Sequence, residues 1–183
     1  MRTTVIGSGS WGSAFARLLA LRGHEVEVLT LAREEAVRLQ ATHENPHFLP
    51  GVQLPQAIRF TGRDDASLDG IELLVYAVPT QAVRDAARWA APRRPRDTLQ
   101  LSLAKGYEIG TLDRPTQVIE EETGAGAAAL SGPNHAEEVG KDMPSATVIA
   151  CADEAVALRL QTALTSETFR VYTNDDVVGV EFC

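Results

Sequence analysis

The fold of this chain is decided by the stretch TTVIGSGSWGSAFARL, residues 3–18. The β-branched and apolar run at 3–6 is typical of a buried strand. After the glycines, small and apolar residues recur at helical spacing, and we expect Ala14, Leu18 and Leu21 on one side of a helix. The stretch therefore predicts a strand, a short turn and a helix in immediate succession.

Three glycines in the turn, Gly7, Gly9 and Gly12, form the pattern G-x-G-x-x-G. Such glycines allow a tight turn, close approach of the backbone to a pyrophosphate, and close contact of helix and strand. The new helix then presents unpaired N–H groups and the positive end of its dipole to the phosphates. Glycine-rich turns also occur without a ligand, but a second apolar run, 26–29, follows at the spacing of a β-α-β unit. We therefore expect a bound dinucleotide.

Further strands and helices alternate along the chain. This alternation is typical of an α/β fold with a Rossmann-like, doubly wound and mostly parallel sheet, in which ligands bind at the carboxyl ends of the strands. We expect Thr80 to cap one helix, and Thr173 or Asn174 to cap the last one. The strands are expected at 3–6, 26–29, 72–78, 98–103, 127–130, 146–150 and 169–172, and helices at 83–90, ending near Pro92, and at 154–164.

Composition excludes several classes of protein. The 183 residues carry a formal net charge of −8, whereas nucleic-acid-binding proteins usually present a basic face. No apolar run approaches the ~20 residues of a membrane span, and the N-terminus lacks the pattern of a secretory signal. Cys151 and Cys183 have no spacing typical of a metal site or a disulfide framework. We expect a cytoplasmic protein that binds no metal, nucleic acid or membrane.

A lysine follows the expected strand at 98–103. Of the 17 basic residues, only Lys105 and Lys141 are lysines, so surface charge is supplied by arginine. Because Lys105 follows the carboxyl end of a strand, it is expected to face the same crevice as the glycine turn. A cation there can bind an anionic substrate or orient a carbonyl group. The alternative is a strand-end lysine that simply reaches solvent.

A second turn of small residues, Ser-Gly-Pro-Asn at 131–134, follows the expected strand at 127–130. Backbone N–H groups in such a turn can bind an anion, although Ser-Gly-Pro is also common turn chemistry. We interpret His135 as structural, or as a support for residues that contact the ligand, rather than catalytic. His43 and His47, in or near the loop at 45–51 that is expected to fold over the sheet edge, are interpreted as packing or surface histidines.

The end of the second strand bears on the choice between NAD and NADP. Proteins selective for NAD usually have an acidic residue here for the ribose hydroxyls, whereas this chain has Thr30 and Leu31. Arg33 could approach a 2′-phosphate, or it could be a solvated residue in the first turn of a helix. The preference between the two coenzymes stays open.

Taken together, six motifs resemble those of the bacterial NAD(P)-dependent glycerol-3-phosphate dehydrogenases. They occur in family order and span nearly the whole chain. The motifs are G-S-G-S-W-G-S-A in the first turn, E-N-P-H-F-L-P-G at 44–51, Y-A-V-P-T-Q at 76–81, L-A-K-G-Y-E at 103–108, S-G-P-N-H-A-E-E-V at 131–139 and Y-T-N-D-D-V-V-G-V-E near the end.

The resemblance implies reversible hydride transfer between NAD(P)H and dihydroxyacetone phosphate, giving sn-glycerol 3-phosphate for phospholipid synthesis. It implies that Ser10, Trp11, Lys105 and Ala136 contact the dinucleotide. Lys105, Gly132 and Asn134 would line the substrate site, with Lys105 contributing electrostatics and positioning to catalysis. A cytoplasmic homodimer is implied for the full-length enzyme.

Two departures from the family pattern stand out. Leu31 occupies the place of an arginine that bacterial members carry near the end of the second strand, which bears on recognition of a 2′-phosphate. The family's proton-transfer lysine lies in a G-A-L-K-N motif beyond Cys183. We therefore expect 1–183 to be an N-terminal NAD(P)-binding domain, with an interdomain helix starting at 174–183 and the all-helical C-terminal domain missing. Such a fragment would bind coenzyme but be inactive.

Other functions remain alternatives at this point. A 6-phosphogluconate or 3-hydroxyacyl-CoA dehydrogenase has the same domain order and shares the first glycine turn. A module that senses NAD(H) without chemistry would have the same coenzyme-binding pattern, and a flavoprotein half-site is a further possibility.

Overall fold

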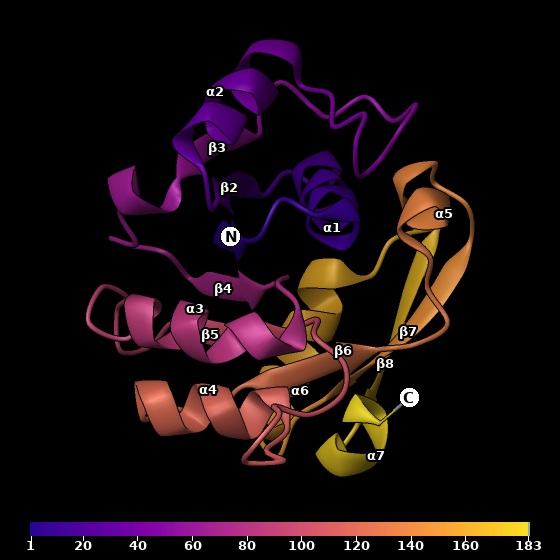
Figure 1. The fold of residues 1–183 in the computed structure, drawn as a ribbon. Helices are drawn as coiled ribbons and strands as arrows, with labels where there is room; N and C mark the ends of the chain where they lie inside the picture. Colours follow the sequence, from indigo (N-terminus) through magenta and orange to yellow (C-terminus); the bar gives the residue numbers. More distant parts are fainter. Residues whose placement is uncertain (183) are drawn as a thin grey trace.

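One sheet of eight strands runs through residues 1–182, the part of the chain that the computed structural model describes (Figure 1). The strands are β1 (Arg2–Ile6), β2 (Glu25–Thr30), β3 (Arg59–Gly62), β4 (Leu73–Tyr76), β5 (Leu99–Ser102), β6 (Ala128–Ser131), β7 (Ser145–Ala150) and β8 (Phe169–Asn174). Their order in the sheet is β3-β2-β1-β4-β5-β6-β7-β8. β1 to β6 are parallel, β7 is antiparallel to β6, and β8 is parallel to β7.

The strand order reverses direction between β1 and β4. The chain first builds outward from β1 to β2 and β3, and then returns to add β4 on the other side of β1. At such a reversal the connections leave the sheet on opposite faces, which opens a crevice outside the carboxyl ends of the two strands. The Rossmann-like, mostly parallel sheet expected from the sequence is confirmed, and it places the first glycine turn at this crevice.

Helices cover both faces of the sheet. In Figure 1, α3 and α4 lie side by side over β4, β5 and β6, whereas α6 lies behind the sheet. The α-helices are α1 (Ser10–Leu21), α2 (Arg33–Thr42), α3 (Val83–Ala90), α4 (Pro115–Thr123), α5 (Ala136–Gly140), α6 (Glu154–Leu164) and α7 (Val177–Glu181), and two 3₁₀ turns are η1 (Arg63–Asp65) and η2 (Thr80–Ala82).

Two apolar cores, one on each face, hold these layers together. On the α1 face, Phe15 is fully buried and its ring meets the edge of the Phe169 ring at a centroid distance of 6.5 Å. On the α3 face, Tyr76 is fully buried and its hydroxyl donates to Gln100 Oε1 at 2.8 Å. Every residue of β4 is buried, which explains why its sequence is a continuous apolar run instead of an alternating one.

Several local expectations are wrong. Thr80 does not cap a helix, because its hydroxyl donates instead to the carbonyl oxygen of Lys105. The last helix is capped by Asp176, whose Oδ1 accepts from the N–H of Gly179 at 2.8 Å, whereas Asn174 still belongs to β8. The expected helix does contain Ala14, Leu18 and Leu21, but Leu21, its last residue, is 57% exposed.

β3 was not expected from the sequence. It is a four-residue strand, RFTG, at the edge of the sheet, where it pairs with β2 alone. Cys151 is a free, half-buried thiol, while Cys183 lies outside the described residues. Within residues 1–182, no helix is both long enough and apolar enough to cross a bilayer.

Candidate functional site

The three glycines of the first turn have different surroundings. Gly7 has a φ of +114°, and a Cβ there would stand 2.5 Å from the carbonyl oxygen of Ala77 in the loop after β4. A Cβ on Gly12 would overlap the carbonyl oxygen of Gly7. A Cβ on Gly9, in contrast, would meet nothing within 4 Å. Gly7 and Gly12 therefore permit the tight turn and its packing on the sheet, while Gly9 leaves one side of the turn open to a ligand.

A hollow of about 400 Å³ lies on one side of the glycine turn, where β1, β2 and β4 end; we call it the strand-end hollow. Gly7 and Gly9 form one wall, and Thr30 and Leu31 at the end of β2 form another. The carboxylate of Glu35, in the first turn of α2, also lines the hollow, and it accepts a hydrogen bond from Ser8 Oγ at 2.9 Å. A dinucleotide-binding fold places the adenosine half of its ligand in this position.

The arginines near the strand-end hollow are engaged with carboxylates. Arg63, which lines the hollow, pairs with Asp85 of α3. Arg33 pairs with Asp65 at 3.3 Å, and its side chain is 75% exposed. Leu31 is 81% exposed at the mouth of the hollow. The charges here are thus of both signs, which agrees with leaving the preference between NAD and NADP open.

A second hollow of about 330 Å³ opens on the other side of the turn; we call it the lysine hollow. It lies between the first turn of α1, the loop after β5 and the loop between β6 and α5. Apart from Gly7, Gly9 and Gly12, all six residues that the family resemblance assigned to coenzyme or substrate line it: Ser10, Trp11, Lys105, Gly132, Asn134 and Ala136.

Polar groups in the lysine hollow are held by the backbone of β6 and β7. Lys105 Nζ donates to the carbonyl oxygen of Gly132 at 3.0 Å. Asn134 Nδ2 donates to the carbonyl oxygen of Ala146 at 2.8 Å, and its buried Oδ1 has no hydrogen-bond partner within residues 1–182. A Cβ on Gly132 would stand 3.0 Å from that Oδ1, so a side chain there would crowd the amide. The hollow combines an ammonium group with an amide, which suits a small anionic ligand.

The loop that carries Lys105 is tied to η2 and α3. Thr80 donates to the carbonyl oxygen of Lys105, as described above, and Gln81 Nε2 donates to the carbonyl oxygen of Tyr107 at 2.7 Å. Gln81 Oε1 also accepts from the N–H of Ile109 at 2.9 Å. These side chains belong to the Y-A-V-P-T-Q motif, and they fix the backbone on both sides of Gly106.

An ion pair extends this attachment. Arg84 of α3 donates to both carboxylate oxygens of Glu108, the shortest N···O distance being 2.7 Å. Hydrogen bonds from Arg84 and then from Thr111 hold the pKa of Glu108 down at about 2, and bonds to Glu108 and then to Glu122 raise the pKa of Arg84. Glu108 is therefore charged at neutral pH, and the loop after Lys105 stays tied to α3.

Two of the histidines, His43 and His47, lie apart from these groups, whereas His135 lines the lysine hollow. His43 is buried, its Nδ1 lies 3.1 Å from the carbonyl oxygen of Pro55, and its ring meets the edge of the Phe60 ring. His47 is exposed beside Phe48. His135 is exposed at the N-cap of α5, where its side chain makes no capping hydrogen bond. The packing position of His43 and the surface position of His47 are those expected from the sequence, whereas the role of His135 stays a prediction.

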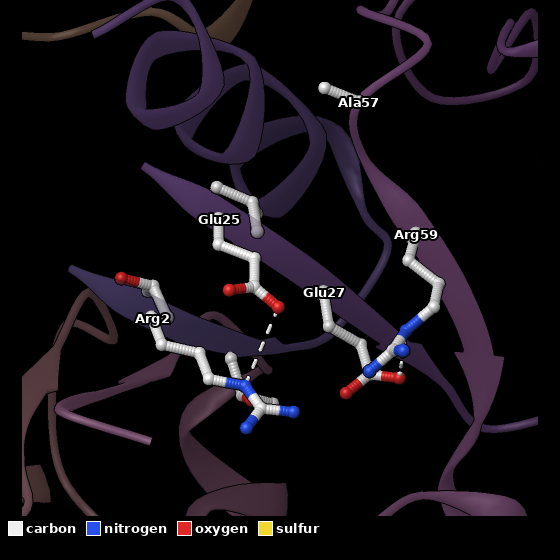
Figure 2. A pocket seen from close by; sticks show the side chains of 8 residues that line it. Arg2, Glu25, Glu27, Ala57 and Arg59 are labelled. Carbon is white, nitrogen blue, oxygen red and sulfur yellow. Dashed lines mark hydrogen bonds and ion pairs between the residues drawn. The ribbon is translucent and has the colours of Figure 1, made fainter. Parts of the chain in front are cut away.

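A third hollow, lined by charged side chains, lies at the opposite edge of the sheet. Figure 2 shows it near the amino ends of β1 and β2, with Arg2, Glu25, Glu27 and Arg59 around it. Glu27 accepts from Arg59 Nε at 3.0 Å and from Thr61 Oγ1 at 2.6 Å, and Arg2 pairs with Glu25 at 3.5 Å. These charges are already paired, and ligands of open α/β sheets bind at the carboxyl ends. The crevice at the other edge is therefore the candidate coenzyme site.

Comparison with known proteins agrees with this geometry. Residues 2–157 match the family described as NAD-dependent glycerol-3-phosphate dehydrogenase N-terminus. The chain belongs to this family. This membership answers the choice among dehydrogenase families that the sequence motifs left open.

Individual members of this dehydrogenase family are similar to this chain over nearly its whole length. A glycerol-3-phosphate dehydrogenase (NAD(P)+) of Nocardia farcinica is 48% identical over 188 aligned residues, covering 98% of this chain and 56% of that protein. One of Moorella thermoacetica is 45% identical, covering 97% of this chain and 53% of that protein. The crystal structure of glycerol-3-phosphate dehydrogenase from Coxiella burnetii is similar with a TM-score of 0.92 at 30% identity, covering 98% of this chain and 55% of that one. The chain thus spans about half the length of these dehydrogenases.

The sequence analysis did not identify two residues of the candidate site, Glu35 and Asn45. Glu35 lines the strand-end hollow from α2, although its position in the first turn of a helix after β2 is a recognisable signal. Asn45 lies against the glycine turn from the loop at 45–51, and the Asn-Pro pair indicated only a turn there. Both contacts join segments far apart in the sequence, which local patterns do not reveal.

Proposed function

We propose that residues 1–183 form the coenzyme-binding domain of a glycerol-3-phosphate dehydrogenase. The whole enzyme would transfer a hydride reversibly between NAD(P)H and dihydroxyacetone phosphate, yielding sn-glycerol 3-phosphate for glycerophospholipid synthesis. The observation that carries this proposal is the glycine turn with its open side at Gly9, flanked by the strand-end hollow and the lysine hollow. Family membership and the shared length of relatives support it.

The residues of the crevice fit a dinucleotide. Space beside Gly9 is free of protein atoms within 4 Å of its Cβ position, so a pyrophosphate can approach the backbone there. The first turn of α1, with Ser10 and Trp11, offers backbone N–H groups and the positive end of a helix dipole to the phosphates. The coenzyme would then extend from the strand-end hollow to the lysine hollow, where Ala136 lies at the start of α5.

Substrate would bind in the lysine hollow. The nicotinamide ring, when bound, supplies or accepts the hydride. Lys105 can bind the phosphate of the substrate or stabilise negative charge on its carbonyl oxygen, because the ammonium group lies at the wall of the hollow beside Gly132. Asn134 orients the substrate from the opposite loop. Proton transfer to the oxygen would come from the half of the enzyme that the relatives have in addition.

We also propose that the whole enzyme is a cytoplasmic homodimer, and that the segment 174–183, in which α7 begins at Val177, leads to its second domain. α7 is attached to this domain, because the buried carboxylate of Glu181 accepts from the N–H of Thr116 at 2.8 Å and pairs with Arg114 at 2.5 Å. Size-exclusion chromatography with light scattering on the whole enzyme tests the dimer.

Titration of residues 1–183 with NADH and NADPH tests the proposed function. Energy transfer from Trp11 to a bound nicotinamide gives the signal, and we expect saturable binding of at least one coenzyme. An assay of NADH oxidation with dihydroxyacetone phosphate should give negligible turnover. Absence of binding to either coenzyme would contradict the proposal, and strong turnover by this chain alone would contradict its role as one domain of the enzyme.

A further inference from the structure

A buried asparagine forms a hydrogen bond with the backbone of the glycine turn. Asn45 is 1% exposed and lies after α2, at the start of the loop at 45–51. Its Nδ2 donates to the carbonyl oxygen of Ser8 at 2.7 Å and to Ser13 Oγ at 2.9 Å. Ser13 Oγ in turn donates to the same Ser8 carbonyl at 3.2 Å. One carbonyl group of the turn thus accepts two hydrogen bonds from buried side chains.

The orientation of the Asn45 amide is determined by this carbonyl. A carbonyl oxygen only accepts hydrogen bonds, so the NH₂ group and not Oδ1 must face Ser8. Oδ1 is then buried without a hydrogen-bond partner within residues 1–182. A buried acceptor without a partner lowers stability, so packing alone does not favour a polar residue at this place. The arrangement indicates that the contact with Ser8 has another role.

The contact fixes the direction of a backbone N–H group. A peptide unit is planar and trans, so the C=O of Ser8 and the N–H of Gly9 point in opposite directions. With the Ser8 carbonyl held toward Asn45 and Ser13, the Gly9 N–H points to the other side of the turn. The turn has room for a ligand beside this residue, because a Cβ on Gly9 would meet nothing within 4 Å. Because glycine has wide conformational freedom, this peptide plane could otherwise rotate.

We propose that Asn45 is a positioning residue for the coenzyme, which holds the Ser8–Gly9 peptide so that the Gly9 N–H faces the pyrophosphate. The inference rests on the proposed coenzyme-binding function and adds a residue to it. Asn45 does not touch the coenzyme. It acts by keeping the binding conformation of the turn in the free protein, so that ordering the turn does not weaken binding.

The test compares coenzyme affinity with stability in matched variants of the whole chain. Asn45→Leu removes both hydrogen bonds to the turn while keeping a side chain of similar size. Leu49→Ala is the control, because Leu49 is buried in the same loop and packs near Gly140. Calorimetric titration with NADH and ADP-ribose, which carry a pyrophosphate, is paired with ligand-observed NMR of adenosine, which lacks one. Thermal unfolding of each variant gives its stability.

We expect Asn45→Leu to bind NADH and ADP-ribose about three- to tenfold more weakly, the range that corresponds to one buried hydrogen-bonding group. Adenosine affinity should not change. Leu49→Ala should unfold at a lower temperature and yet bind NADH as tightly as the original chain. This separation distinguishes positioning from a merely structural contribution, which would lower the unfolding temperature alone.

Three results overturn the inference. They are unchanged NADH affinity in Asn45→Leu, an equal loss for adenosine, or an equal loss in Leu49→Ala. If Asn45→Leu does not fold, Ser13→Ala decides, because it removes one of the two bonds to the Ser8 carbonyl and should weaken NADH binding about twofold. If the original chain binds neither NADH nor NADPH, the proposed function itself is overturned; binding by the original chain with no effect of Asn45→Leu overturns only the positioning role.

Discussion

The ammonium nitrogen of Lys105 lies 3.0 Å from the carbonyl oxygen of Gly132, and this contact joins the loops that follow β5 and β6. A lysine ammonium group has three N–H donors, so the bond to Gly132 leaves donors for a ligand in the lysine hollow. Ser10 and Trp11 at the start of α1 line the same hollow. A coenzyme on the glycine turn would extend into the same space.

Replacing Lys105 by alanine should therefore weaken coenzyme binding. We expect NADH to bind about three- to tenfold more weakly at low ionic strength, because an exposed charged donor is lost. Lys141→Ala, which removes the only other lysine of the chain, is the matched control and should leave the affinity unchanged. Fluorescence titration of NADH measures both. An unaffected Lys105→Ala variant would return Lys105 to a surface role.

The glycine turn predicts a separation of stability from affinity. Gly12→Ala should lower the free energy of unfolding by about 1–3 kcal/mol or more, because its Cβ overlaps the backbone of Gly7. Gly9→Ala has room and an ordinary backbone conformation, φ −66°, and should unfold nearly as the original chain does. Its methyl group occupies the open side of the turn, so NADH affinity should fall instead. Urea unfolding and NADH titration measure the two effects, and a Gly9→Ala variant that binds normally would contradict this geometry.

Sequence patterns predicted the buried strands and the place of the glycine turn because both depend on local order. A continuous apolar run such as Leu73–Tyr76 has few alternatives to a buried strand, and glycines between strand and helix leave little choice of turn. Lys105 was expected at the crevice of the glycine turn because parallel strands end at the same edge of a sheet, a rule of topology that needs no contacts. The assignment of Gly132 to the substrate site came from the family resemblance.

Other features depend on contacts that local patterns do not encode. β3 is short and carries Arg59, so its sequence has only a weak apolar pattern. It forms by pairing with the free edge of β2. Thr80 has the chemistry of a helix cap, but the carbonyl oxygen of Lys105 is a nearer partner in three dimensions. Asn45 meets Ser8 across 37 positions of sequence. In each case a long-range partner decided the role.

The ion pair of Arg84 and Glu108 predicts a dependence of stability on pH. The pKa of Glu108 falls from 4.5 to about 2 in the folded protein, because Arg84 and Thr111 donate hydrogen bonds to its carboxylate. Its contribution to stability is therefore present above the unfolded pKa of 4.5 and is lost as pH falls toward 2.

Glu108→Gln tests this dependence by urea unfolding between neutral pH and pH about 2. The variant should be less stable than the original chain at neutral pH, and the difference should shrink below pH 4.5 as the carboxylate is protonated. Glu167→Gln, a change at an exposed glutamate, is the control and should show no such convergence. A difference that stays constant with pH would show that Arg84 does not control the charge of Glu108.

The strand-end hollow predicts how the coenzyme preference can be changed. NADPH carries an additional phosphate on the adenosine ribose, and a guanidinium group binds phosphate well, whereas a carboxylate repels it. Leu31→Arg at the exposed mouth of the hollow should shift the ratio of NADPH to NADH affinity toward NADPH by about three- to tenfold, and Glu35→Gln should shift it in the same direction by less. Val37→Arg places the same charge on an exposed apolar position of α2 outside this hollow and should leave the ratio unchanged. Separate titrations with the two coenzymes measure the ratio. If Val37→Arg shifts it as much as Leu31→Arg does, general charge attraction and not a ribose site at the end of β2 is responsible.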